Sequence, residues 1–208
     1  MRNYKGEYLT GVFLREGKTR FVAWVEIEGK RRKCYVPMST KLSRYFDPVG
    51  CEVRLQKKGN RLWLEQVKCG RCWVWVNAAK APELLCKQLE RRGLLVEKER
   101  TVSGYRFDLY ADDVGYEVKS VLSDQREIHY PNAPSSRRQS QLQRISKLVK
   151  RGQKAEWVIV SLSPLVQKIM ISKDSEGKRL KAAVEKGMKL RAYRCSGKGG
   201  LVNCEVEL

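Results

Sequence analysis

The chain has 208 residues, with 43 lysines and arginines against 23 aspartates and glutamates, and a formal net charge of +20 at pH 7. So many positive charges repel one another in a compact protein, so a polyanion such as nucleic acid is the expected partner. A lysine-rich surface that only keeps the protein soluble is the alternative explanation of the charge. The hydrophobic content of 42% excludes a disordered basic tail as the whole protein, and the single histidine excludes multi-histidine zinc sites.

No apolar run approaches the roughly 18 residues of a membrane span, and the first residues have no apolar signal core. We therefore expect a cytoplasmic protein without a membrane partner, whose seven cysteines are thiols. Cys69 and Cys72 have the spacing of half a zinc site, but the remaining cysteines lack a second such pair. Packed thiols are the favoured interpretation, and a disulfide or a structural zinc ion are the alternatives.

The first 75 residues predict a small β-barrel. Runs rich in β-branched and aromatic residues are separated by turns, and a short helical stretch over 39–47, capped by Ser39 or Thr40, lies between the third and fourth runs. This order is typical of an OB-fold, a platform for nucleic acids and sugars, with SH3-like and Greek-key barrels as alternatives. The five predicted strands lie at 6–16, 19–29, 30–38, 50–58 and 61–69.

From residue 76 onward the pattern predicts a mixed sheet flanked by helices. The continuous apolar run 157–163 is typical of a strand that is buried on both faces. We therefore expect an α/β (α+β) protein of two domains, 1–75 and 76–208. The predicted helices of the second domain are 81–93, 135–151 and 176–187, and its predicted strands are 94–102, 105–111, 115–122, 157–163, 188–196 and 201–208.

Two of these strands carry charge near their middle. A two-residue loop at Asp112-Asp113 would place Asp108 directly opposite Glu117. Adjacent carboxylates repel each other unless a cation compensates them, and Mg²⁺ accepts one or two carboxylates together with waters and phosphates. Lys119 would then lie beside the metal-bound water and orient or deprotonate it. A solvated sheet face with a cross-strand ion pair is the alternative.

The predicted helix 135–151 is strongly basic and contains no acid. Its apolar residues fall on one arc of the helix, with Gln141 at the edge of this arc, where it could reach the charged hairpin. Serines at the helix start suit contact with a phosphate. We therefore predict that the helix grips a nucleic-acid backbone, and a merely solvated face is the alternative. Its cations are Arg137, Arg138, Arg144, Lys147, Lys150 and Arg151.

In the predicted barrel, the third strand carries the best candidates for nucleic-acid contact, which are Arg31, Arg32 and Tyr35. The tryptophans of the barrel strands alternate with polar residues and are interpreted as core residues rather than as platforms for base stacking.

At these residues the chain resembles the sugar fermentation stimulation protein A (SfsA) family. Members have an Arg-x-Asp strand, a hydrophobic-Glu-Val-Lys strand, and a Phe-Pro-Asp-Ala segment that runs into a Thr-x-Arg-Gly helix. The corresponding segments here are 106–108, 116–119, 130–133 and 135–138. The resemblance implies an N-terminal OB-fold and a C-terminal restriction-endonuclease-like domain of the PD-(D/E)XK type.

The resemblance also implies roles for single residues. Asp108 and Glu117 would bind the metal, Mg²⁺ or Mn²⁺, Lys119 would be the catalytic lysine, and Arg137 would contact a phosphate. Gln141, a further candidate catalytic residue, stands where the family usually has a helix histidine, and Asn132 stands where it has an aspartate.

The sequence therefore predicts a DNA-binding protein with a metal-dependent phosphodiesterase (nuclease) site that acts on single- or double-stranded DNA. The alternative is a non-catalytic DNA-binding regulatory protein that keeps the nuclease scaffold, and an RNA-binding protein is a third interpretation. A homodimer is compatible with this chemistry, because cutting both strands usually requires two sites.

Overall fold

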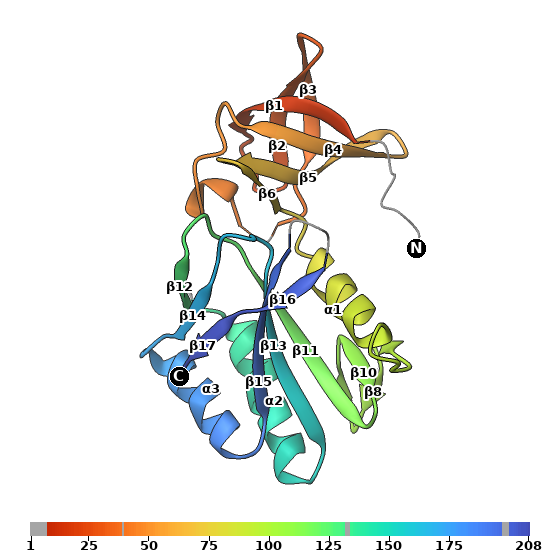
Figure 1. The fold of residues 1–208 in the computed structure, drawn as a ribbon, viewed down its shortest axis with the longest axis vertical. Coiled ribbons are helices and arrows are strands. Elements are labelled where there is room, and N and C mark those ends of the chain that lie inside the picture. The colour runs from red at the N-terminus through yellow and green to blue at the C-terminus, as the bar shows by residue number, and fades with distance from the viewer. Residues whose placement is uncertain (1–7, 39, 132–133, 197–199) are drawn as a thin grey trace.

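The computed structural model describes residues 8–38, 40–131, 134–196 and 200–208. A β-barrel forms one end of the molecule, and a mixed sheet with helices forms the other (Figure 1). This arrangement confirms the predicted α/β architecture with an OB-fold-like barrel at the N-terminus. Within the described residues, no helix is both long and apolar enough to cross a membrane.

The barrel closes through a pairing between strands that are distant in the sequence. Antiparallel neighbours follow the order β3-β2-β1-β4-β5, and β3 then pairs in parallel with β5 at Cys34↔Leu62 and Tyr35↔Trp63. A further strand, β6, extends β5 beyond the closure. The barrel strands are β1 (Leu9–Glu16), β2 (Val22–Ile27), β3 (Lys30–Tyr35), β4 (Glu52–Lys58), β5 (Arg61–Cys69) and β6 (Cys72–Trp75).

The short helical stretch between β3 and β4 is a single 3₁₀ turn, η1 (Leu42–Arg44). The N–H of its first residue, Leu42, donates a 2.6 Å hydrogen bond to Oε1 of Glu16 at the end of β1. The predicted cap by Thr40 is wrong, since the residue at the N-cap is Lys41, which makes no side-chain cap. Ser39, the other predicted cap, lies outside the described residues.

The second sheet has the strand order β16-β15-β13-β11-β10-β7, with three parallel strands in the centre and antiparallel strands at the edges. β13, the middle strand of the parallel centre, is buried on both faces, as predicted for residues 157–163. The strands are β7 (Glu97–Lys98), β10 (Leu109–Ala111), β11 (Val114–Val121), β13 (Lys154–Ser161), β15 (Lys189–Cys195) and β16 (Leu201–Asn203).

Smaller elements complete this half of the molecule. A three-stranded parallel sheet, whose first two strands the sequence analysis did not predict, has the order β12-β14-β17. A separate hairpin, β8 with β9, precedes β10. These strands are β8 (Thr101–Val102), β9 (Tyr105–Arg106), β12 (Glu127–Tyr130), β14 (Lys168–Ile171) and β17 (Glu205–Glu207).

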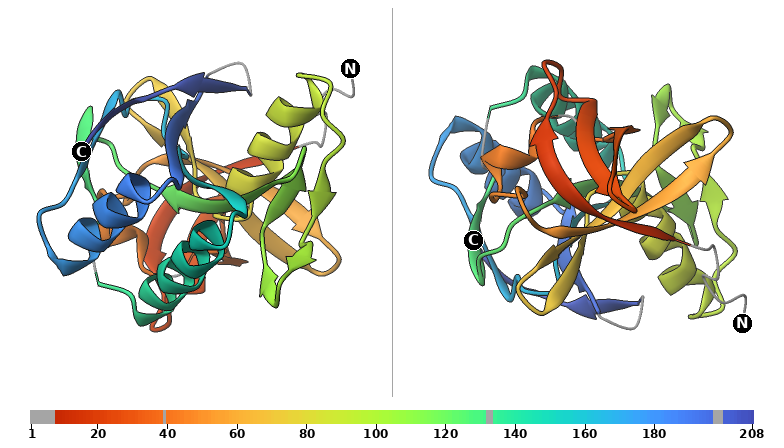
Figure 2. Two further views of the ribbon diagram at one scale, coloured as in Figure 1. Left: turned by 90° about the horizontal axis from the view of Figure 1, so that it is seen from below. Right: turned by 90° about the horizontal axis from the view of Figure 1, so that it is seen from above.

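The helices cover the two faces of the second sheet: α1 (Lys80–Glu90) lies on one face, while α2 (Ser136–Lys150) and α3 (Ser175–Glu185) lie together on the other (Figure 2). The alternation along β13 shows the same division. Val158 packs in a core shared with α1 and the barrel, whereas the neighbouring Trp157 packs in a core shared with α2 and α3.

The junction between barrel and sheet is packed rather than open. One hydrophobic core runs from the barrel strands through α1 to the adjoining face of the second sheet. The backbone crosses the junction as well, because the Trp75 N–H donates a 3.0 Å hydrogen bond to the Leu162 carbonyl. The division into domains 1–75 and 76–208 stays a prediction, since a shared core ties the two sides together.

The predicted strands 94–102 and 105–111 are both interrupted. Glu99 interrupts the first of them with a positive φ of 54°, a conformation that breaks extended pairing, and the second is divided into β9 and β10 at residues 107–108. At this second break, Phe107 packs in the core on the α2 side of the sheet, while Leu109 packs in the core on the α1 side. An uninterrupted strand would have placed these two side chains on the same face.

Candidate functional site

A β-hairpin carries the two predicted metal ligands. β10 and β11 pair with the register Leu109↔Tyr116 and Ala111↔Val114. Asp112 and Asp113 form the two-residue turn with φ values of 49° and 59°, the geometry that favours tight hairpins. The predicted two-residue loop is therefore confirmed, and its register, continued by one residue beyond β10, sets Asp108 opposite Glu117.

Glu117 lies on the α2 face of β11, since its strand neighbours Tyr116 and Val118 pack in the core on the other face. The side chain is buried, with 1% of the residue exposed. Two donors meet its Oε1 atom, namely Lys119 Nζ at 2.5 Å and Gln141 Nε2 at 2.8 Å. A buried carboxylate requires such compensation.

Lys119 and Gln141 also bind each other. Lys119 Nζ donates a 2.8 Å hydrogen bond to Gln141 Oε1, which closes a triangle with Glu117. The ammonium group lies 5.0 Å from the ring centroid of Trp157 on β13, within the range of a cation–π contact. Gln141 thus reaches the hairpin from α2, as the sequence predicted, and the amine is held in one place from three sides.

Asp108 lies just before β10 and is partly buried. Its Oδ2 atom accepts a 2.7 Å hydrogen bond from the Val118 N–H. Burial raises the pKa of this carboxyl, and the charge of Glu117 raises the pKa further. The Val118 N–H and the positive charges of Lys119 and Arg137 act in the opposite direction. The charge of Glu117 is therefore close enough to disfavour ionisation of Asp108, and added positive charge between the two carboxylates would relieve this cost.

Tyr105 belongs to the cluster and was missed by the sequence analysis. Its hydroxyl donates a 2.6 Å hydrogen bond to Glu117 Oε2. Burial and the neighbouring carboxylates raise the pKa of Tyr105, so it remains a neutral donor. Regular alternation would place Tyr105 and Asp108 on opposite faces, so only the break in the strand brings Tyr105 to Glu117. The spacing of these residues in the sequence therefore does not predict that Tyr105 contacts Glu117.

The break in the strand depends on a glycine in β11. Phe107 is fully buried, and a Cβ atom on Gly115 would lie only 2.6 Å from its ring carbons. The absence of a side chain at Gly115 therefore lets the Phe107 ring pack against the strand and holds the segment that carries Asp108.

The oxygen donors of Asp108 and Glu117 suit a hard divalent cation, because Mg²⁺ is commonly bound by one or two carboxylates with waters completing the shell. In the described residues, no three of the histidine, cysteine, aspartate and glutamate side chains form a group that could hold a metal ion. A cation at this cluster would thus take most of its ligands from water and substrate.

The cysteines form no zinc site in the part of the chain that the structure describes. Cys69 and Cys72 face each other across the β5–β6 hairpin, and all seven cysteines are free thiols. Burial raises the pKa of Cys69 to about 12, which keeps its thiol protonated. Of the three interpretations of these cysteines, the structure favours packed thiols.

The basic helix α2 has the predicted faces. Leu142, Ile145 and Leu148 are buried, and Ser135 caps the helix by accepting a 3.3 Å hydrogen bond from the Arg138 N–H. The cations on the opposite side are exposed: Arg137, Arg144, Lys147, Lys150 and Arg151. Arg144 also lies over the Tyr105 ring, 5.3 Å from its centroid, which connects the basic face to the carboxylate cluster.

Arg138 differs from the other cations of α2. Its guanidinium pairs with both oxygens of Glu176 on α3, a residue that is 3% exposed, and lies 5.6 Å from the Tyr130 ring. Arg138 thus ties α2 to α3. Asn132, which stands where the family has an aspartate, lies outside the described residues.

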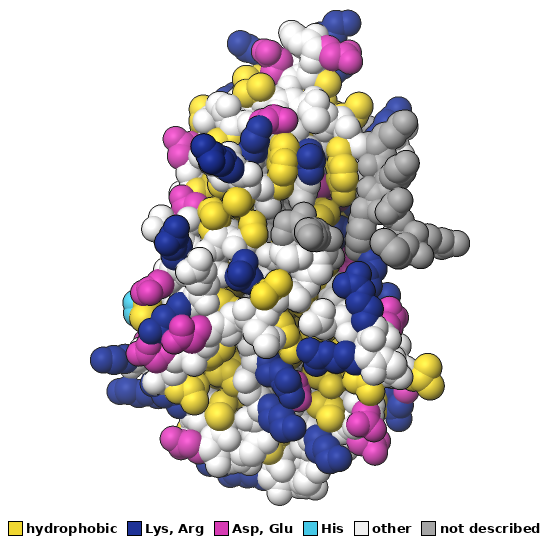
Figure 3. Space-filling view, in the orientation of Figure 1, with side chains coloured by type: hydrophobic (Ala, Val, Ile, Leu, Met, Phe, Trp, Pro, Cys, Tyr) yellow, Lys and Arg dark blue, Asp and Glu magenta, His cyan; other side chains and the backbone are white. Residues whose placement is uncertain are grey.

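The predicted contacts on the barrel are separate from this cluster. Arg31 and Arg32 are exposed on β3, whereas Tyr35 at the end of β3 is half-buried against Trp63. Lys and Arg side chains are spread over both the barrel and the sheet half on the face seen in Figure 3. The structure therefore divides the predicted nucleic-acid contacts between two regions, α2 and the barrel.

Comparison with known proteins identifies the family. Residues 76–199, more than half of the chain, match the family described as "Sugar fermentation stimulation protein RE domain". The chain belongs to the sugar fermentation stimulation protein (SfsA) family. The resemblance noted in the sequence is confirmed.

Relatives of the SfsA family match nearly the whole chain. A sugar fermentation stimulation protein homolog from Acetivibrio thermocellus is 28% identical over 92% of this chain and 90% of its own length. A homolog from Caldanaerobacter subterraneus is 25% identical over 96% of this chain and 95% of its own. The solved structure of Pyrococcus furiosus SfsA in complex with Ca²⁺ matches with a TM-score of 0.82 at 23% identity and covers 97% of this chain and 96% of that one. The fold of this SfsA family member therefore agrees with that structure in both the barrel and the sheet.

Proposed function

We propose that this protein is a Mg²⁺- or Mn²⁺-dependent phosphodiesterase that cuts DNA at the cluster of Asp108, Glu117 and Lys119. The observation that carries the proposal is the convergence of two carboxylates and one amine on a single face of the sheet, beside a basic helix. A chain with a net charge of +20 is suited to a polyanionic substrate.

The carboxylates of Asp108 and Glu117 would hold the cation. A bound divalent cation supplies Lewis-acid polarisation of the phosphate and a lower pKa of a coordinated water. The raised pKa of Asp108 supports this assignment, since positive charge at the cluster would favour its ionised form. The Ca²⁺ complex of Pyrococcus furiosus SfsA supports it as well, because Ca²⁺ and Mg²⁺ both take oxygen ligands.

Lys119 would act on the reacting groups. Its ammonium is held by Glu117 and Gln141, so it is already fixed before substrate arrives. From this position it would orient the attacking water and donate hydrogen bonds to the negative charge that develops on the phosphate. Tyr105 and Gln141 would serve as positioning residues, because both hold the carboxylate of Glu117.

The exposed cations of α2 would hold the DNA backbone. Arg137 lies in the first turn of α2, and its charge lowers the pKa of Asp108, which supports a role for it beside the cluster. A phosphate held by Arg137 would therefore lie next to the proposed metal ligands. Arg144 would contact the backbone from the next turns of the helix, beside Tyr105.

A specific observation favours the alternative of a non-catalytic DNA-binding protein. Glu117 already accepts hydrogen bonds from Tyr105, Lys119 and Gln141, so its charge is compensated without a metal ion. A carboxylate whose hydrogen bonds all come from the protein would be expected in a domain that keeps the nuclease fold without cleaving DNA.

The test is to incubate the protein with labelled single-stranded, double-stranded and branched DNA in Mg²⁺ or Mn²⁺. We expect metal-dependent cutting that falls by about 100-fold or more in Lys119→Met, since general acid–base groups contribute factors of this size. Lys147→Met is the matched control, because it removes an exposed amine from α2 and should weaken binding only. DNA binding without cutting by the wild type would establish the non-catalytic alternative, and a preference for RNA of matched sequence would contradict both.

A further inference from the structure

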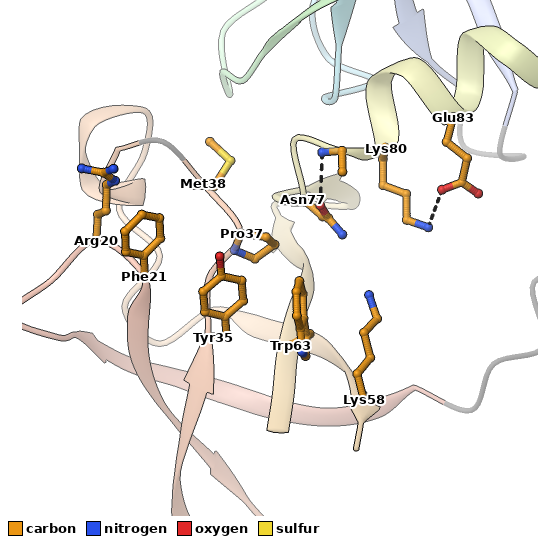
Figure 4. A pocket seen from close by; sticks show the side chains of 11 residues that line it. Arg20, Phe21, Tyr35, Pro37, Met38, Lys58, Trp63, Asn77, Lys80 and Glu83 are labelled. Carbon is orange, nitrogen blue, oxygen red and sulfur yellow. Dashed lines mark hydrogen bonds and ion pairs between the residues drawn. The ribbon is translucent and has the colours of Figure 1, made fainter. Parts of the chain in front are cut away.

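The barrel contains a pocket that the proposed phosphodiesterase site does not use (Figure 4). Barrel closure creates it, because the parallel pairing of β3 with β5 sets Tyr35 directly beside Trp63. Phe21, just before β2, completes a row of three aromatic rings. The pocket has a volume of about 530 Å³ and opens near the start of α1, where Lys80 and Glu83 line its rim.

The three rings form a surface of the kind on which a flat ligand stacks. Phe21 and Tyr35 are nearly parallel, with centroids 6.0 Å apart and an interplanar angle of 12°. Tyr35 and Trp63 pack edge to face, with ring centroids 4.5 Å apart and an interplanar angle of 61°. Phe21 is 38% exposed, so part of this aromatic row is open to solvent although burial would stabilise it. The sequence interpretation of Trp63 as a simple core residue misses this arrangement.

Cations flank the aromatic row at both ends. The Arg20 guanidinium lies 4.3 Å from the Phe21 ring centroid, and Lys58 Nζ lies 4.5 Å from that of Trp63. Lys58 is fixed in this position, since its ammonium pairs at 2.8 Å with Glu65, which is 1% exposed. The acid on the rim, Glu83, pairs with Lys80 and Lys87, so cations dominate the pocket's charge.

We propose that this pocket binds the bases of a single-stranded DNA segment, which stack on Phe21, Tyr35 and Trp63 while Arg20 and Lys58 meet the adjoining phosphates. Every base has a π-face, so an aromatic row between cations recognises single strands of any sequence. The inference rests on the proposed function for the identity of the polymer, DNA. It adds to that function by naming single-stranded or frayed DNA as the substrate class. Sugars also stack on aromatic rings, but cations at both ends of the row favour an anionic ligand over a neutral sugar.

The experiment measures binding in EDTA, so that no cutting is required. The probes are a fluorescently labelled thymidine oligonucleotide and an oligonucleotide of the same length with abasic sites in place of the bases, both followed by anisotropy. We expect the wild type to bind the base-carrying probe more tightly. Phe21→Leu and Trp63→Leu should each weaken that binding by roughly 5- to 150-fold for a lost stacked base, and leave the abasic probe unaffected.

Trp73→Leu is the matched control. Trp73 is also a half-buried strand tryptophan of the barrel sheet with a cation over its ring, Arg54 at 4.0 Å, but it does not line the pocket. Its replacement should leave the binding of both probes unchanged. Thermal unfolding of each variant checks the fold, and Phe21→Leu is the least disruptive because that ring is partly exposed.

Equal binding of the two probes by the wild type, or unchanged binding by both pocket variants, would overturn the proposal. Displacement of the oligonucleotide by a neutral maltooligosaccharide would overturn it as well, because the pocket would then be a sugar site. The outcome is separable from that of the cutting assay. Absent cutting by the wild type, with intact base-dependent binding in EDTA, would reject the phosphodiesterase alone.

Discussion

The hydroxyl of Tyr105 donates a 2.6 Å hydrogen bond to Oε2 of Glu117, a residue that is 1% exposed. Because Lys119 and Gln141 donate to the other oxygen, both oxygens of the carboxylate have hydrogen-bond donors. Its orientation is thus fixed before any ligand binds. A preorganised carboxylate of this kind is what a metal-binding site requires.

Replacing Tyr105 by phenylalanine removes one hydrogen bond to a buried charge. We expect Tyr105→Phe to lower the free energy of unfolding by about 1.5–3 kcal/mol, the usual cost for hydrogen bonds to charged groups. Urea unfolding at neutral pH measures this change. Tyr110→Phe is the control, because this buried tyrosine is on the same hairpin and its hydroxyl has no hydrogen-bond partner within the described residues. Equal losses in the two variants would contradict the assigned role of the Tyr105–Glu117 bond.

Cation binding at the cluster should stabilise the folded protein. A ligand that binds only the native state adds about 2.7 kcal/mol at a free concentration of one hundred times its Kd. We therefore expect Mn²⁺ to raise the Tm of the wild type in thermal unfolding and to have little effect on Asp108→Asn. Asp112→Asn removes the same charge from the exposed turn of this hairpin, where asparagine accepts the positive φ, and should respond to Mn²⁺ as the wild type does. A Tm shift that persists in Asp108→Asn would place the cation elsewhere.

The raised pKa of Asp108 predicts a pH dependence of stability in the absence of metal. Burial and the charge of Glu117 raise this pKa in the folded state above its ordinary value. The folded protein therefore binds the proton more tightly than the unfolded chain does, so this contribution to stability is lost as pH rises from the ordinary pKa through the raised one.

Asp108→Asn removes that contribution, and asparagine can still accept the hydrogen bond from the Val118 N–H. We expect the variant to be more stable than the wild type at neutral pH and to lose this advantage in acid. Unfolding by urea across the acidic range, with EDTA present, gives the comparison. An advantage that stays constant with pH would show that the charge of Asp108 does not cause it.

Two adjacent arginines of α2 should respond in opposite ways to the same substitution. Arg138→Gln leaves Glu176 buried without its partner, so we expect a loss of about 3–5 kcal/mol in unfolding free energy. Arg137→Gln should change stability by less than about 0.5 kcal/mol. Instead, it should weaken DNA binding and reduce the slope of log K against log salt by about one. Similar stability losses in both variants would contradict the division between the structural and the DNA-binding arginine.

Much of the fold follows from patterns within single elements. The alternation in β1 to β5 predicts the barrel strands, and the apolar arc of α2 predicts the face that it buries. The Asp112-Asp113 turn fixes the register that sets Asp108 opposite Glu117. These features depend on neighbours a few residues apart, so the sequence carries them locally.

The remaining features required the tertiary structure. The break at Phe107, which Gly115 makes room for, turns Tyr105 toward Glu117. The pair of Arg138 with Glu176 joins residues that are 38 positions apart, and closure of β3 on β5 builds the aromatic row in the barrel.

The sequence by itself thus determined the strand pattern, the basic helix and the opposed carboxylates, because each rests on a short period or a single turn. Only the packing of the whole chain decided which donors surround Glu117 and which arginine is used for structure. Those contacts join distant segments, and their geometry depends on how the two hydrophobic cores fill space.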